Sequence, residues 1–526
     1  MNLLHPRCLP PVTGTCITDP DRIAAQHAGM LGDESRLRAS RITALYIPET
    51  VAEVAAAMAG SSGPLAISGG RTGIAGGAVP DDGASLLVLD RLRPRPVLRR
   101  HADGWSLRVG AATTLAEIDA CLRQGDHDAP DGLPPDPLFY PVDATESSAQ
   151  IGGTIATNAS GARSFAYGPT RSWVRAVEVV LADGRVLALR RGAVRADDAG
   201  FALVLADGSQ RPIPITDLPL PATKHTLGYP LARGMDAIDL FIGSEGTLGI
   251  ITAAELDLCP RPRQRLYLMQ FVTDAAQAAA YAEHLRARPE GLLAIEFFGQ
   301  EALDQVRSRG PLTAAAPDLA RLPATVTAAV YCEAAFDDEV ALDALAAHLQ
   351  AAAEAVGADP AQSWAGCTDA DGAAMRRLRH ALPESVNALI GERQRDCPGL
   401  HKVGTDMAVP PAALPDMLHH YEAVSAQMQT VLFGHLGDGH LHLNILPRDH
   451  HDLAQAKALY ANLARAAVAL GGSIAAEHGL GRLKRELLRL QYPPPALNAL
   501  WAVKTALDPD HRLNPGVLLP EYGANE

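Results

Sequence analysis

The sequence contains little cysteine, and the cysteines it has form no metal-binding motif. Seven of them are scattered over 526 residues, and no two stand in a C-x-x-C arrangement. This excludes a zinc finger and a ferredoxin-type cluster, and the chain carries no haem motif either. Scattered cysteines are typical of a reducing compartment. We therefore expect a cytoplasmic protein, with attachment to the surface of the inner membrane left open.

Long hydrophobic runs and basic clusters are also missing. No apolar run reaches the roughly 18 residues of a membrane span, and the first residues lack the long apolar region of a secretory signal. With 60 acidic and 46 basic residues, the net charge is −14. This charge argues against a nucleic-acid partner and against a polybasic membrane patch. A length of 526 residues predicts two domains.

Two common nucleotide-binding motifs are absent, although glycine is abundant. The chain has no G-x-x-x-x-G-K-[ST], and its first glycine-rich stretch is not a G-x-G-x-x-G, so NAD and ATP have no support. That stretch, SGGRTGIAGG at residues 68–77, follows a short apolar strand expected at residues 64–67. Backbone N–H groups in such a turn can cradle a phosphate. On its own, the stretch fits a phosphate cradle and a solvated loop equally well.

Two further glycine-rich stretches favour a ligand. They are PVDATESSAQIGGTIATNASGARSFAYG at residues 141–168 and IGSEGTLGII at residues 242–251. Three such stretches predict one extended ligand that several turns contact. Between them, apolar runs at 174–181 and 186–189 flank an Asp-Gly pair, which predicts a β-hairpin. We expect another hairpin within residues 191–220 and assign it no function.

The composition changes after the prolines at residues 260–262, where we place a domain boundary. Beyond it the pattern alternates between strands and helices, which predicts an α+β domain with an antiparallel sheet. We expect strands at 265–272, 292–298 and 325–331, and helices at 275–287 and 339–356.

A cluster of polar residues lies in FGHLGDGHLHLN at residues 433–444. In a strand, alternate side chains share a face, so His440, His442 and Asn444 point one way, and His435 precedes them on a turn. Downstream, Glu477 and His478 lie among small residues. Two histidines and a carboxylate with open positions indicate a catalytic metal site. A purely structural histidine pair is the alternative.

The three glycine-rich stretches together resemble the FAD-binding domain of the flavoenzymes related to vanillyl-alcohol oxidase and para-cresol methylhydroxylase. The third stretch matches that family's pattern throughout, whereas Ser68, Arg71 and Gly73 replace an Arg, a Gly and a Ser of the first pattern. The resemblance implies an α+β fold with a two-subdomain FAD-binding domain at 1–262 and an α+β substrate (cap) domain over an antiparallel sheet at 263–505. A segment at 506–526 then returns to the FAD domain. The residues it implies as FAD contacts are Ser68, Gly69, Gly70, Arg71, Thr72, Gly73, Gly76, Gly77, Pro141, Asp143, Gly152, Gly153, Thr154, Asn158, Gly161, Glu245, Gly249, Ile250, Ile251 and Asn514.

The second half resembles the D-2-hydroxyacid dehydrogenase branch of these flavoenzymes, whose pattern is G-H-x-G-D-G-N-x-H-x-N followed by E-H-G-x-G. The resemblance implies that His435, His442 and Glu477 hold a divalent metal, with zinc as first choice and Mn²⁺ or Fe²⁺ open. Asn444 and His478 then face the substrate. His440 stands where Asn is usual, which leaves open which histidines are ligands.

Two basic residues complete the site that the resemblance implies. Arg379 matches the arginine that holds the substrate carboxylate, a task for which its planar fork is suited, while Arg376 and Arg377 fit a solvated helix face. Lys402 is a second candidate for binding a substrate carboxylate. It lies two positions before Gly404, where the related enzymes have a basic or polar residue. The polar stretch with Arg393 and Arg395 is expected to be a solvated loop.

The resemblance implies oxidation of a D-2-hydroxy acid to the 2-keto acid, with hydride passed to flavin N5 and the proton taken by His478. An outside acceptor, such as a quinone, a cytochrome or an electron-transfer flavoprotein, reoxidises the flavin. D-lactate has one carboxylate to bind and D-2-hydroxyglutarate has two. Because Arg379 is the one good carboxylate-binding residue, D-lactate is the favoured substrate, and glycolate is a further alternative. The same fold also hosts non-redox FAD enzymes like alkyl-dihydroxyacetonephosphate synthase, and a flavin-binding partner subunit without catalysis is a further hypothesis. A homodimer is also open.

Overall fold

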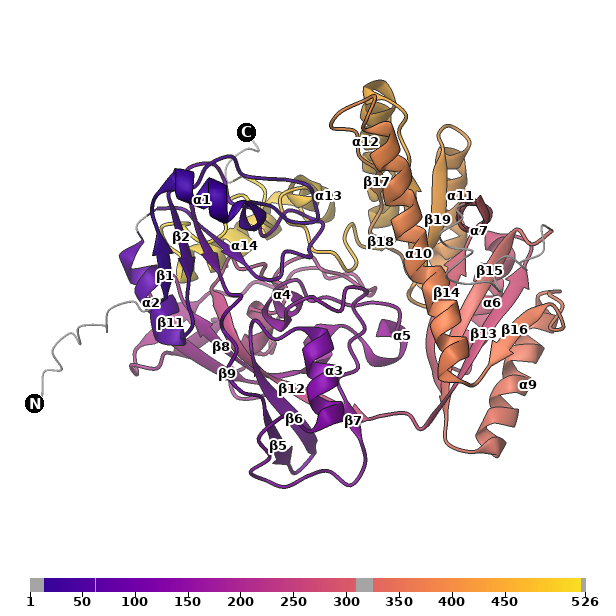
Figure 1. Ribbon diagram of the computed structural model, residues 1–526, viewed down its shortest axis with the longest axis horizontal. Helices are drawn as coiled ribbons and strands as arrows, with labels where there is room; N and C mark the ends of the chain where they lie inside the picture. Colours follow the sequence, from indigo (N-terminus) through magenta and orange to yellow (C-terminus); the bar gives the residue numbers. More distant parts are fainter. Residues whose placement is uncertain (1–13, 62, 309–324, 522–526) are drawn as a thin grey trace, which may run out of the picture.

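The computed structural model describes residues 14–61, 63–308 and 325–521, which form two lobes (Figure 1). The amino-terminal lobe contains two sheets and a small hairpin. The second lobe is built on one large antiparallel sheet. The prediction of an α+β fold is confirmed. The chain passes from the first lobe to the second between β12 (Ile250–Pro260) and β13 (Gln264–Val272).

The first sheet of the amino-terminal lobe has the order β1-β2-β4-β3. Its helix α2 (Val51–Gly60) begins with a capping box, in which Thr50 and Glu53 satisfy each other's backbone N–H groups. The short strand expected at residues 64–67 is confirmed as β3. The bounds are β1 Thr15–Ile17, β2 Ala44–Ile47, β3 Leu65–Ser68 and β4 Ser85–Val88, with α1 at Pro20–Gln26.

The second sheet has the order β5-β6-β12-β8-β9, with β7 paired to the end of β12. The expected Asp-Gly hairpin is confirmed as β8 and β9, and the hairpin expected within residues 191–220 is β10 and β11. The bounds are β5 Val97–His101, β6 Gly104–Gly110, β7 Leu138–Phe139, β8 Val174–Val180, β9 Val186–Arg190, β10 Phe201–Val204 and β11 Gln210–Ile213, with α3 at Leu115–Gln124 and α4 at Ile151–Ala156.

The sheet of the second lobe runs β16-β13-β15-β14-β19-β20-β17, and β18 also pairs with β20. Alternate residues of β13 serve two cores. Leu268 packs into the core that includes α6 and α9, whereas Met269 packs with α7 and α10. Helices therefore cover both faces. The expected strands and helices are present, but β15 starts three residues late, at Ala328. The bounds are β14 Leu292–Phe298, β15 Ala328–Phe336, β16 Ser363–Gly366, β17 Val403–Gly404, β18 Met407–Ala408, β19 Thr430–His435, β20 His440–Ile445, α6 Ala275–Arg286, α7 Gln300–Ser308, α9 Glu339–Ala355, α10 Asp369–Arg393, α11 Leu414–Ser425 and α12 His450–Ala469.

The end of the chain returns to the amino-terminal lobe, where Figure 1 shows it in yellow. Leu513 forms a parallel bridge with Leu65 beside β3. The side chain of Asn514 accepts a hydrogen bond from the Ile67 N–H (2.7 Å) and donates one to the Glu245 carbonyl (2.7 Å). One buried amide side chain thus connects the carboxyl-terminal segment to the strand before the first glycine-rich stretch and to the third stretch.

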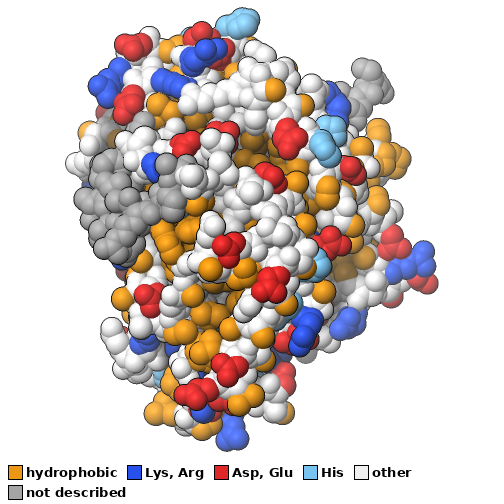
Figure 2. Space-filling model, turned by 90° about the vertical axis from the view of Figure 1, so that its right-hand side faces the viewer, with side chains coloured by type: hydrophobic (Ala, Val, Ile, Leu, Met, Phe, Trp, Pro, Cys, Tyr) orange, Lys and Arg blue, Asp and Glu red, His pale blue; other side chains and the backbone are white. Residues whose placement is uncertain are grey.

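Charged side chains are mixed over the face shown in Figure 2, and the basic ones do not gather into one patch there. Among the described residues, no helix combines the length and hydropathy that a membrane crossing requires.

The ammonium group of Lys504, on α14 (Pro494–Leu507), holds the carboxyl-terminal segment in place, and we expect its removal to lower the stability of the fold. It is buried, and it donates to the carbonyls of Thr247 (2.7 Å) and Leu513 (2.8 Å) and pairs with Asp508. Lys504→Met leaves the Asp508 carboxylate buried without its counter-charge, a change that costs about 3–5 kcal/mol. We expect a clearly lower denaturant midpoint and weaker FAD retention.

The matched control is Lys457→Met, because Lys457 is exposed on α12. Equal denaturant midpoints for the two variants would contradict the importance of the Lys504 contacts.

Candidate active site at the junction of the two lobes

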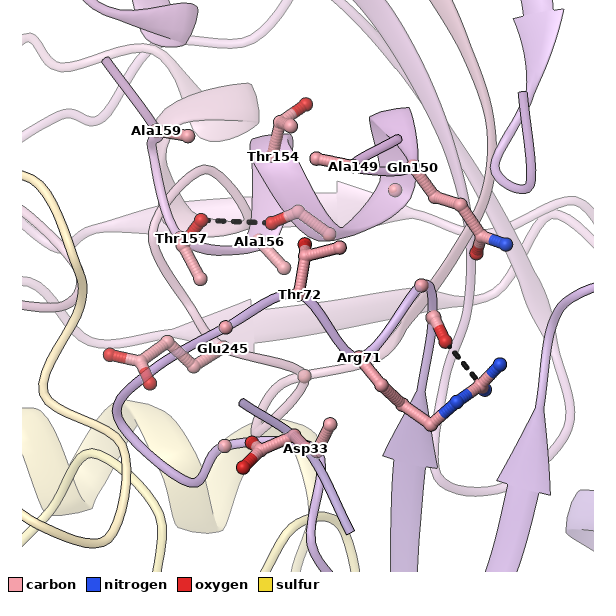
Figure 3. A pocket seen from close by; sticks show the side chains of 18 of the residues that line it. Asp33, Arg71, Thr72, Ala149, Gln150, Thr154, Ala156, Thr157, Ala159 and Glu245 are labelled. Atoms are coloured by element: carbon pink, nitrogen blue, oxygen red, sulfur yellow. Dashed lines mark hydrogen bonds between the residues drawn. The ribbon is translucent and has the colours of Figure 1, made fainter. Parts of the chain in front are cut away.

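A cavity of about 320 Å³ lies where the three glycine-rich stretches meet. The first stretch follows β3, the second contains α4, and the third leads into β12. Figure 3 shows Thr72, Thr157 and Glu245, one from each stretch, around this space. The predicted FAD contacts that line it are Gly69, Gly70, Arg71, Thr72, Gly73, Gly77, Gly152, Gly153, Thr154, Glu245, Gly249, Ile251 and Asn514.

The glycines explain why the cavity exists. A Cβ atom added to Gly73 or to Gly153 would meet no atom within 4 Å, so a side chain there would project into the space a ligand needs. Gly152 serves packing instead, because its Cβ would lie 2.8 Å from that of Ala111. A wall of glycine backbone suits the pyrophosphate and ribityl parts of a dinucleotide. The cavity therefore fits FAD.

Arg71, which stands where the family pattern has glycine, is accommodated without filling the cavity. Its backbone is left-handed, with φ at 60°. Its guanidinium donates to the Gly69 carbonyl (2.7 Å) and to Asp90 Oδ2 (2.7 Å). Because these two acceptors hold the side chain, Arg71 adds a positive charge beside the cavity and leaves its centre open.

Seven predicted FAD contacts do not line this cavity. Ser68 is fully buried at the end of β3, and Asn158 accepts a hydrogen bond from the Arg171 N–H (2.9 Å). Gly161 allows close packing on the Asp143 carbonyl, where a Cβ would lie at 1.7 Å. These residues shape the loops rather than the space between them. The remaining members of this group are Gly76, Pro141, Asp143 and Ile250.

The lining also includes residues that the motifs did not indicate, among them Asp33, Gln150 and Thr157. Gln150 precedes α4, and its side chain donates to Asp90 Oδ1 (3.1 Å). Gln150 and Thr157 lie within the second glycine-rich stretch, at positions that its pattern does not specify, whereas nothing in the sequence indicated Asp33.

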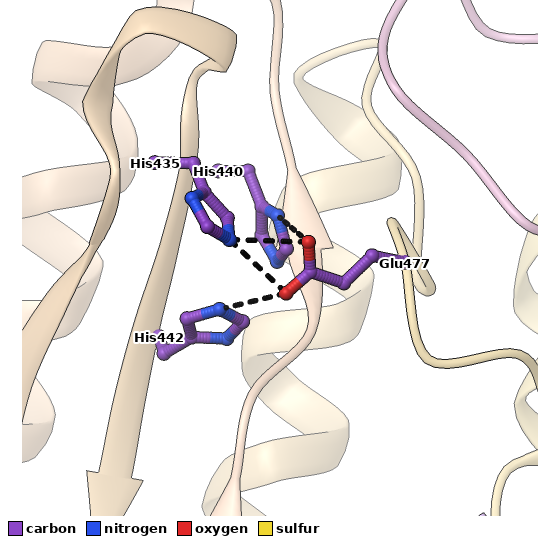
Figure 4. A group of neighbouring side chains, drawn as sticks. All are labelled: His435, His440, His442 and Glu477. Atoms are coloured by element: carbon purple, nitrogen blue, oxygen red, sulfur yellow. Dashed lines mark hydrogen bonds and ion pairs between the residues drawn. The ribbon is translucent and has the colours of Figure 1, made fainter. Parts of the chain in front are cut away.

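Beside this cavity, histidines from two paired strands meet one carboxylate (Figure 4). His435 ends β19, His440 and His442 lie on β20, and Glu477 comes from the loop after α12. The Nε2 atoms of His435 and His442 lie 3.1 Å and 3.2 Å from Glu477. Each of the four side chains offers one ligand atom, and these atoms lie within 4.8 Å of one another. The arrangement fits a divalent ion.

The outer nitrogens of two of these rings face acceptors. His435 Nδ1 lies 2.7 Å from Glu296, and His442 Nδ1 lies 3.1 Å from the Thr405 carbonyl. Such partners orient metal-binding histidines and leave the other nitrogen to the ion. Glu296, on β14, was not predicted, because it lies inside an otherwise apolar strand.

The carboxylate of Glu477 is also held by the other lobe. Lys224 Nζ lies 2.8 Å from Glu477 Oε2, and both side chains are buried. Burial alone would raise the pKa of Glu477, but His435 and Lys224 outweigh it and hold that pKa well below its usual range. Burial likewise acts to lower the pKa of His435, and the carboxylates of Glu296 and Glu477 raise it to about 9. Lys224 lies outside every recognised motif and was missed.

The predicted substrate-facing residues surround this cluster. Asn444 continues the polar face of β20 and is buried next to Gly404, where a Cβ would lie 2.7 Å from its Oδ1. Arg379 Nε, on α10, lies 2.9 Å from Glu296 Oε2, and its side chain is 12% exposed. His478 lines the FAD cavity and stacks on His442, with ring centroids 5.4 Å apart.

Lys402 lies just before β17, and the structure describes no hydrogen bond or ion pair for it among residues 14–61, 63–308 and 325–521. Its burial, together with the nearby charge of Arg36, lowers its pKa to about 8. Lys402 is therefore a cation without a counter-charge within the described part of the chain.

Two expectations about the neighbouring arginines are wrong. Arg393 does not lie in a solvated loop, because α10 extends to it and its half-buried guanidinium donates to the carbonyls of Leu446 (2.6 Å) and Pro447 (2.9 Å). Arg376 lies over the ring of Tyr267, 5.4 Å from its centroid. Arg377 and Arg395 are exposed, as expected.

Asp406 connects the parts of the site, although no motif indicated a role for it. It accepts a hydrogen bond from Lys484 Nζ (2.6 Å) and others from the backbone N–H groups of Glu477 and His478. The imidazole of His478 lies 3.3 Å away through Nδ1. Burial would raise the pKa of Asp406, but Lys484 and His478 hold it well below its usual range.

The FAD cavity and the histidine cluster adjoin each other. Glu477 and His478 line the cavity, and Glu245 accepts hydrogen bonds from the N–H groups of Leu480 (2.7 Å) and Gly481 (2.8 Å). The third glycine-rich stretch is thus bonded to the segment that carries Glu477. A ligand in the cavity and an ion in the cluster would share one site.

These features define the class of the protein as a flavin-binding enzyme, and comparison with known proteins agrees. Residues 42–190 match the FAD binding domain family, and residues 261–518 match the family described as FAD linked oxidases, C-terminal domain. The chain is similar to alkyldihydroxyacetonephosphate synthase in structure, with a TM-score of 0.62, 15% identity, and coverage of 91% of this chain and 77% of the other. That likeness concerns the fold.

Relatives at higher sequence identity are known. A D-2-hydroxyglutarate dehydrogenase of Xanthomonas citri pv. viticola is 32% identical, over 91% of this chain and 90% of the relative. A D-lactate dehydrogenase of Anaerostipes hadrus is 27% identical, covering 86% and 84%. Glycolate oxidase subunit GlcD of Bacillus subtilis is 26% identical, covering 86% and 83%. The chain belongs to the FAD-linked oxidases, and the predicted fold, FAD cofactor and enzyme class are confirmed.

The cavity also predicts how the flavin is held. Covalent attachment in this fold uses a histidine or cysteine, and neither occurs at residues 68–77 or 141–168. Among the described residues that line the cavity, His478 is the sole member of these two types. We expect noncovalent FAD, so acid precipitation should leave all the yellow colour in the supernatant. Colour in the pellet would show a covalent bond, and His478→Ala would then identify or exclude His478 as its site.

Proposed function

We propose that this enzyme oxidises a D-2-hydroxy acid to the 2-keto acid with FAD, assisted by a divalent ion, and passes the electrons to an external acceptor. The observation that carries the proposal is that metal-ligand side chains and His478 lie at the edge of the FAD cavity. A 2-hydroxy acid offers a hydroxyl and a carboxylate, which are suitable ligands for such an ion. The names of the relatives support this substrate class.

His435, His442 and Glu477 are the proposed metal ligands, with zinc as first choice for two imidazoles and Mn²⁺ or Fe²⁺ as alternatives. Lys224 keeps the Glu477 carboxylate ionised, as a metal ligand must be. When bound, the ion supplies a Lewis acid for the substrate hydroxyl, and FAD supplies the hydride acceptor.

His478 is the proposed base for the hydroxyl proton. Its Nδ1 lies 3.3 Å from Asp406, whose ionised carboxylate favours the tautomer with the proton on Nδ1. Nε2 then carries the lone pair and takes the proton. Because Lys484 and two backbone N–H groups fix Asp406, the direction of the imidazole is also fixed.

Arg379 is the proposed clamp for the substrate carboxylate. Its Nε faces Glu296, and none of the described residues accepts a hydrogen bond from its two terminal nitrogens. These nitrogens form the fork that pairs with a carboxylate through two hydrogen bonds. A substrate held by Arg379 and by the ion has its C2 substituents in a defined order, which is the basis for selecting the D-enantiomer.

Anaerobic mixing with D- and L-2-hydroxy acids tests the function. We expect D-lactate to bleach the flavin spectrum and L-lactate to bleach it far more slowly. No bleaching by any D-2-hydroxy acid would favour a non-redox enzyme or a partner subunit. Equal rates for D- and L-lactate would mean that Arg379, the ion and the flavin do not fix three points around C2, and the site assignment would be wrong.

Removal of the metal gives a separate test. A chelator should abolish turnover while FAD stays bound, because the cavity that holds FAD is built mainly from the amino-terminal lobe. Zn²⁺ or Mn²⁺ should restore turnover. His442→Ala should lose both metal content and activity, whereas His420→Ala, at an exposed histidine of α11, should keep both. Normal turnover and metal content in His442→Ala would contradict the proposed ligand set.

The size of the substrate depends on Lys402. With Arg379 as the only clamp, D-lactate is the first candidate. D-2-hydroxyglutarate is the second, because Lys402 has no counter-charge among the described residues and a relative carries that name. The protonated fraction of Lys402 falls as the pH rises through about 8. If Lys402 binds the second carboxylate, KM for D-2-hydroxyglutarate should rise above that pH while KM for D-lactate does not.

Side-by-side assays decide between the two acids. Under the D-lactate assignment, Lys402→Met changes kcat/KM for D-lactate no more than the exposed control Lys457→Met does. The D-lactate assignment would be overturned by a wild-type kcat/KM for D-2-hydroxyglutarate well above that for D-lactate, provided that Lys402→Met removes both this advantage and its pH dependence.

A further inference from the structure

The metal cluster contains a third imidazole that the resemblance does not account for. His440 is the first residue of β20 and pairs directly with His435 across the hairpin. Its Nδ1 lies 3.8 Å from Glu477 Oε2, and its ring centroid lies 4.4 Å from that of His442 (Figure 4). The related dehydrogenases have Asn in this position of their pattern. This chain therefore brings three imidazoles to one carboxylate.

The ring of His440 is fully buried, and its Nδ1 has no hydrogen-bond partner among the described residues. A buried polar atom without a partner destabilises the folded state, so such atoms generally have a role. In His435 and His442, by contrast, Nδ1 is bonded to an acceptor outside the cluster and Nε2 lies close to Glu477. A ligand between the rings would satisfy the free nitrogen of His440.

The orientation of His440 matches that of the two other histidines. Its Nε2 lies 3.3 Å from Asp406 Oδ1, while Nδ1 faces Glu477. In each of the three rings one nitrogen is directed to an acceptor outside the cluster and the other to Glu477. This is the arrangement by which outer partners orient histidine ligands. Each of the three imidazoles thus has its own outer acceptor and is oriented as a metal ligand would be.

We propose that His440 is a fourth protein ligand, through Nδ1, so that the centre has three imidazoles and one carboxylate. The inference rests on the metal site of the proposed function and adds a residue to it. Strand geometry explains how the third imidazole enters, since residues 440 and 442 share a face of β20 and His435 lies opposite on β19. Asp406 positions His440 and His478 alike, which connects the ligand set to the proposed base.

A fourth ligand changes which ion suits the site. Zinc with four protein ligands is usually tetrahedral and closed, which leaves no position for a substrate. An ion that accepts five or six ligands keeps positions for the hydroxyl and carboxylate of the substrate. The three-imidazole set therefore shifts the preference from zinc toward Mn²⁺, Fe²⁺ or Co²⁺.

The test uses the FAD-containing protein loaded with Co²⁺. Each histidine ligand of Co²⁺ gives one exchangeable, strongly shifted N–H proton signal in the NMR spectrum, so the signals count the imidazole ligands. We expect three signals in the wild type and two in His440→Asn, the residue of the family pattern. Competition against a chelator should show Co²⁺ affinity lower by at least about 100-fold in His440→Asn, because even the loss of an outer partner costs 10–100-fold.

His401→Asn is the matched control, because His401 is exposed and bonds only to the Gly399 carbonyl among the described residues. It should keep three signals and wild-type affinity. Two signals in the wild type would overturn the proposal and leave the two-histidine site standing. That measurement needs no variant, so it decides even if His440→Asn fails to fold. A wild type that binds no Co²⁺ would overturn this inference and the proposed metal together, while flavin bleaching would still test the oxidation.

Discussion

The Glu477 carboxylate receives contacts from both lobes, and the arrangement of the site depends on it. Lys224 reaches it from the amino-terminal lobe, and histidines of β19 and β20 reach it from the other side. A buried carboxylate costs several kcal/mol unless cations or hydrogen bonds compensate it. Removing Lys224, or removing the histidines, therefore leaves the buried Glu477 carboxylate less well compensated and weakens the remaining contacts. The same residue lines the FAD cavity, so the position of the lobes also determines the distance between that cavity and the histidine cluster.

A second buried carboxylate supports the first. Asp406 holds the backbone of Glu477 and His478 and lies beside the rings of His440 and His478, while Lys484 balances its charge. Glu296 does the same for His435 and Arg379. Arg379, His435, His440 and His478 thus each have a carboxylate partner that orients the side chain. Such preorganisation reduces the entropy that substrate binding must otherwise remove.

Sequence patterns predicted the parts of this structure that depend on local rules. The Asp-Gly pair at residues 183–184 predicted the β8–β9 hairpin, and alternation on β20 placed His440 and His442 on one face. The patterns did not reveal Lys224, Glu296 or Asp406, because their roles arise from contacts between residues distant in the chain. Arg393 was placed in a loop because its neighbours are polar, whereas carbonyls at the end of β20 hold it at the end of α10. Charge pairing across lobes has no spacing that a single sequence can show.

The central claim is that flavin and metal share one site at the junction of the lobes. Crystals of the FAD-containing protein grown with Co²⁺, with diffraction data collected at the cobalt absorption edge, test it most directly. The account predicts one strong anomalous peak between the histidine rings and Glu477, with the flavin ring in the adjoining cavity beside His478. An ion bound elsewhere, or a flavin ring turned away from His478, would contradict the account.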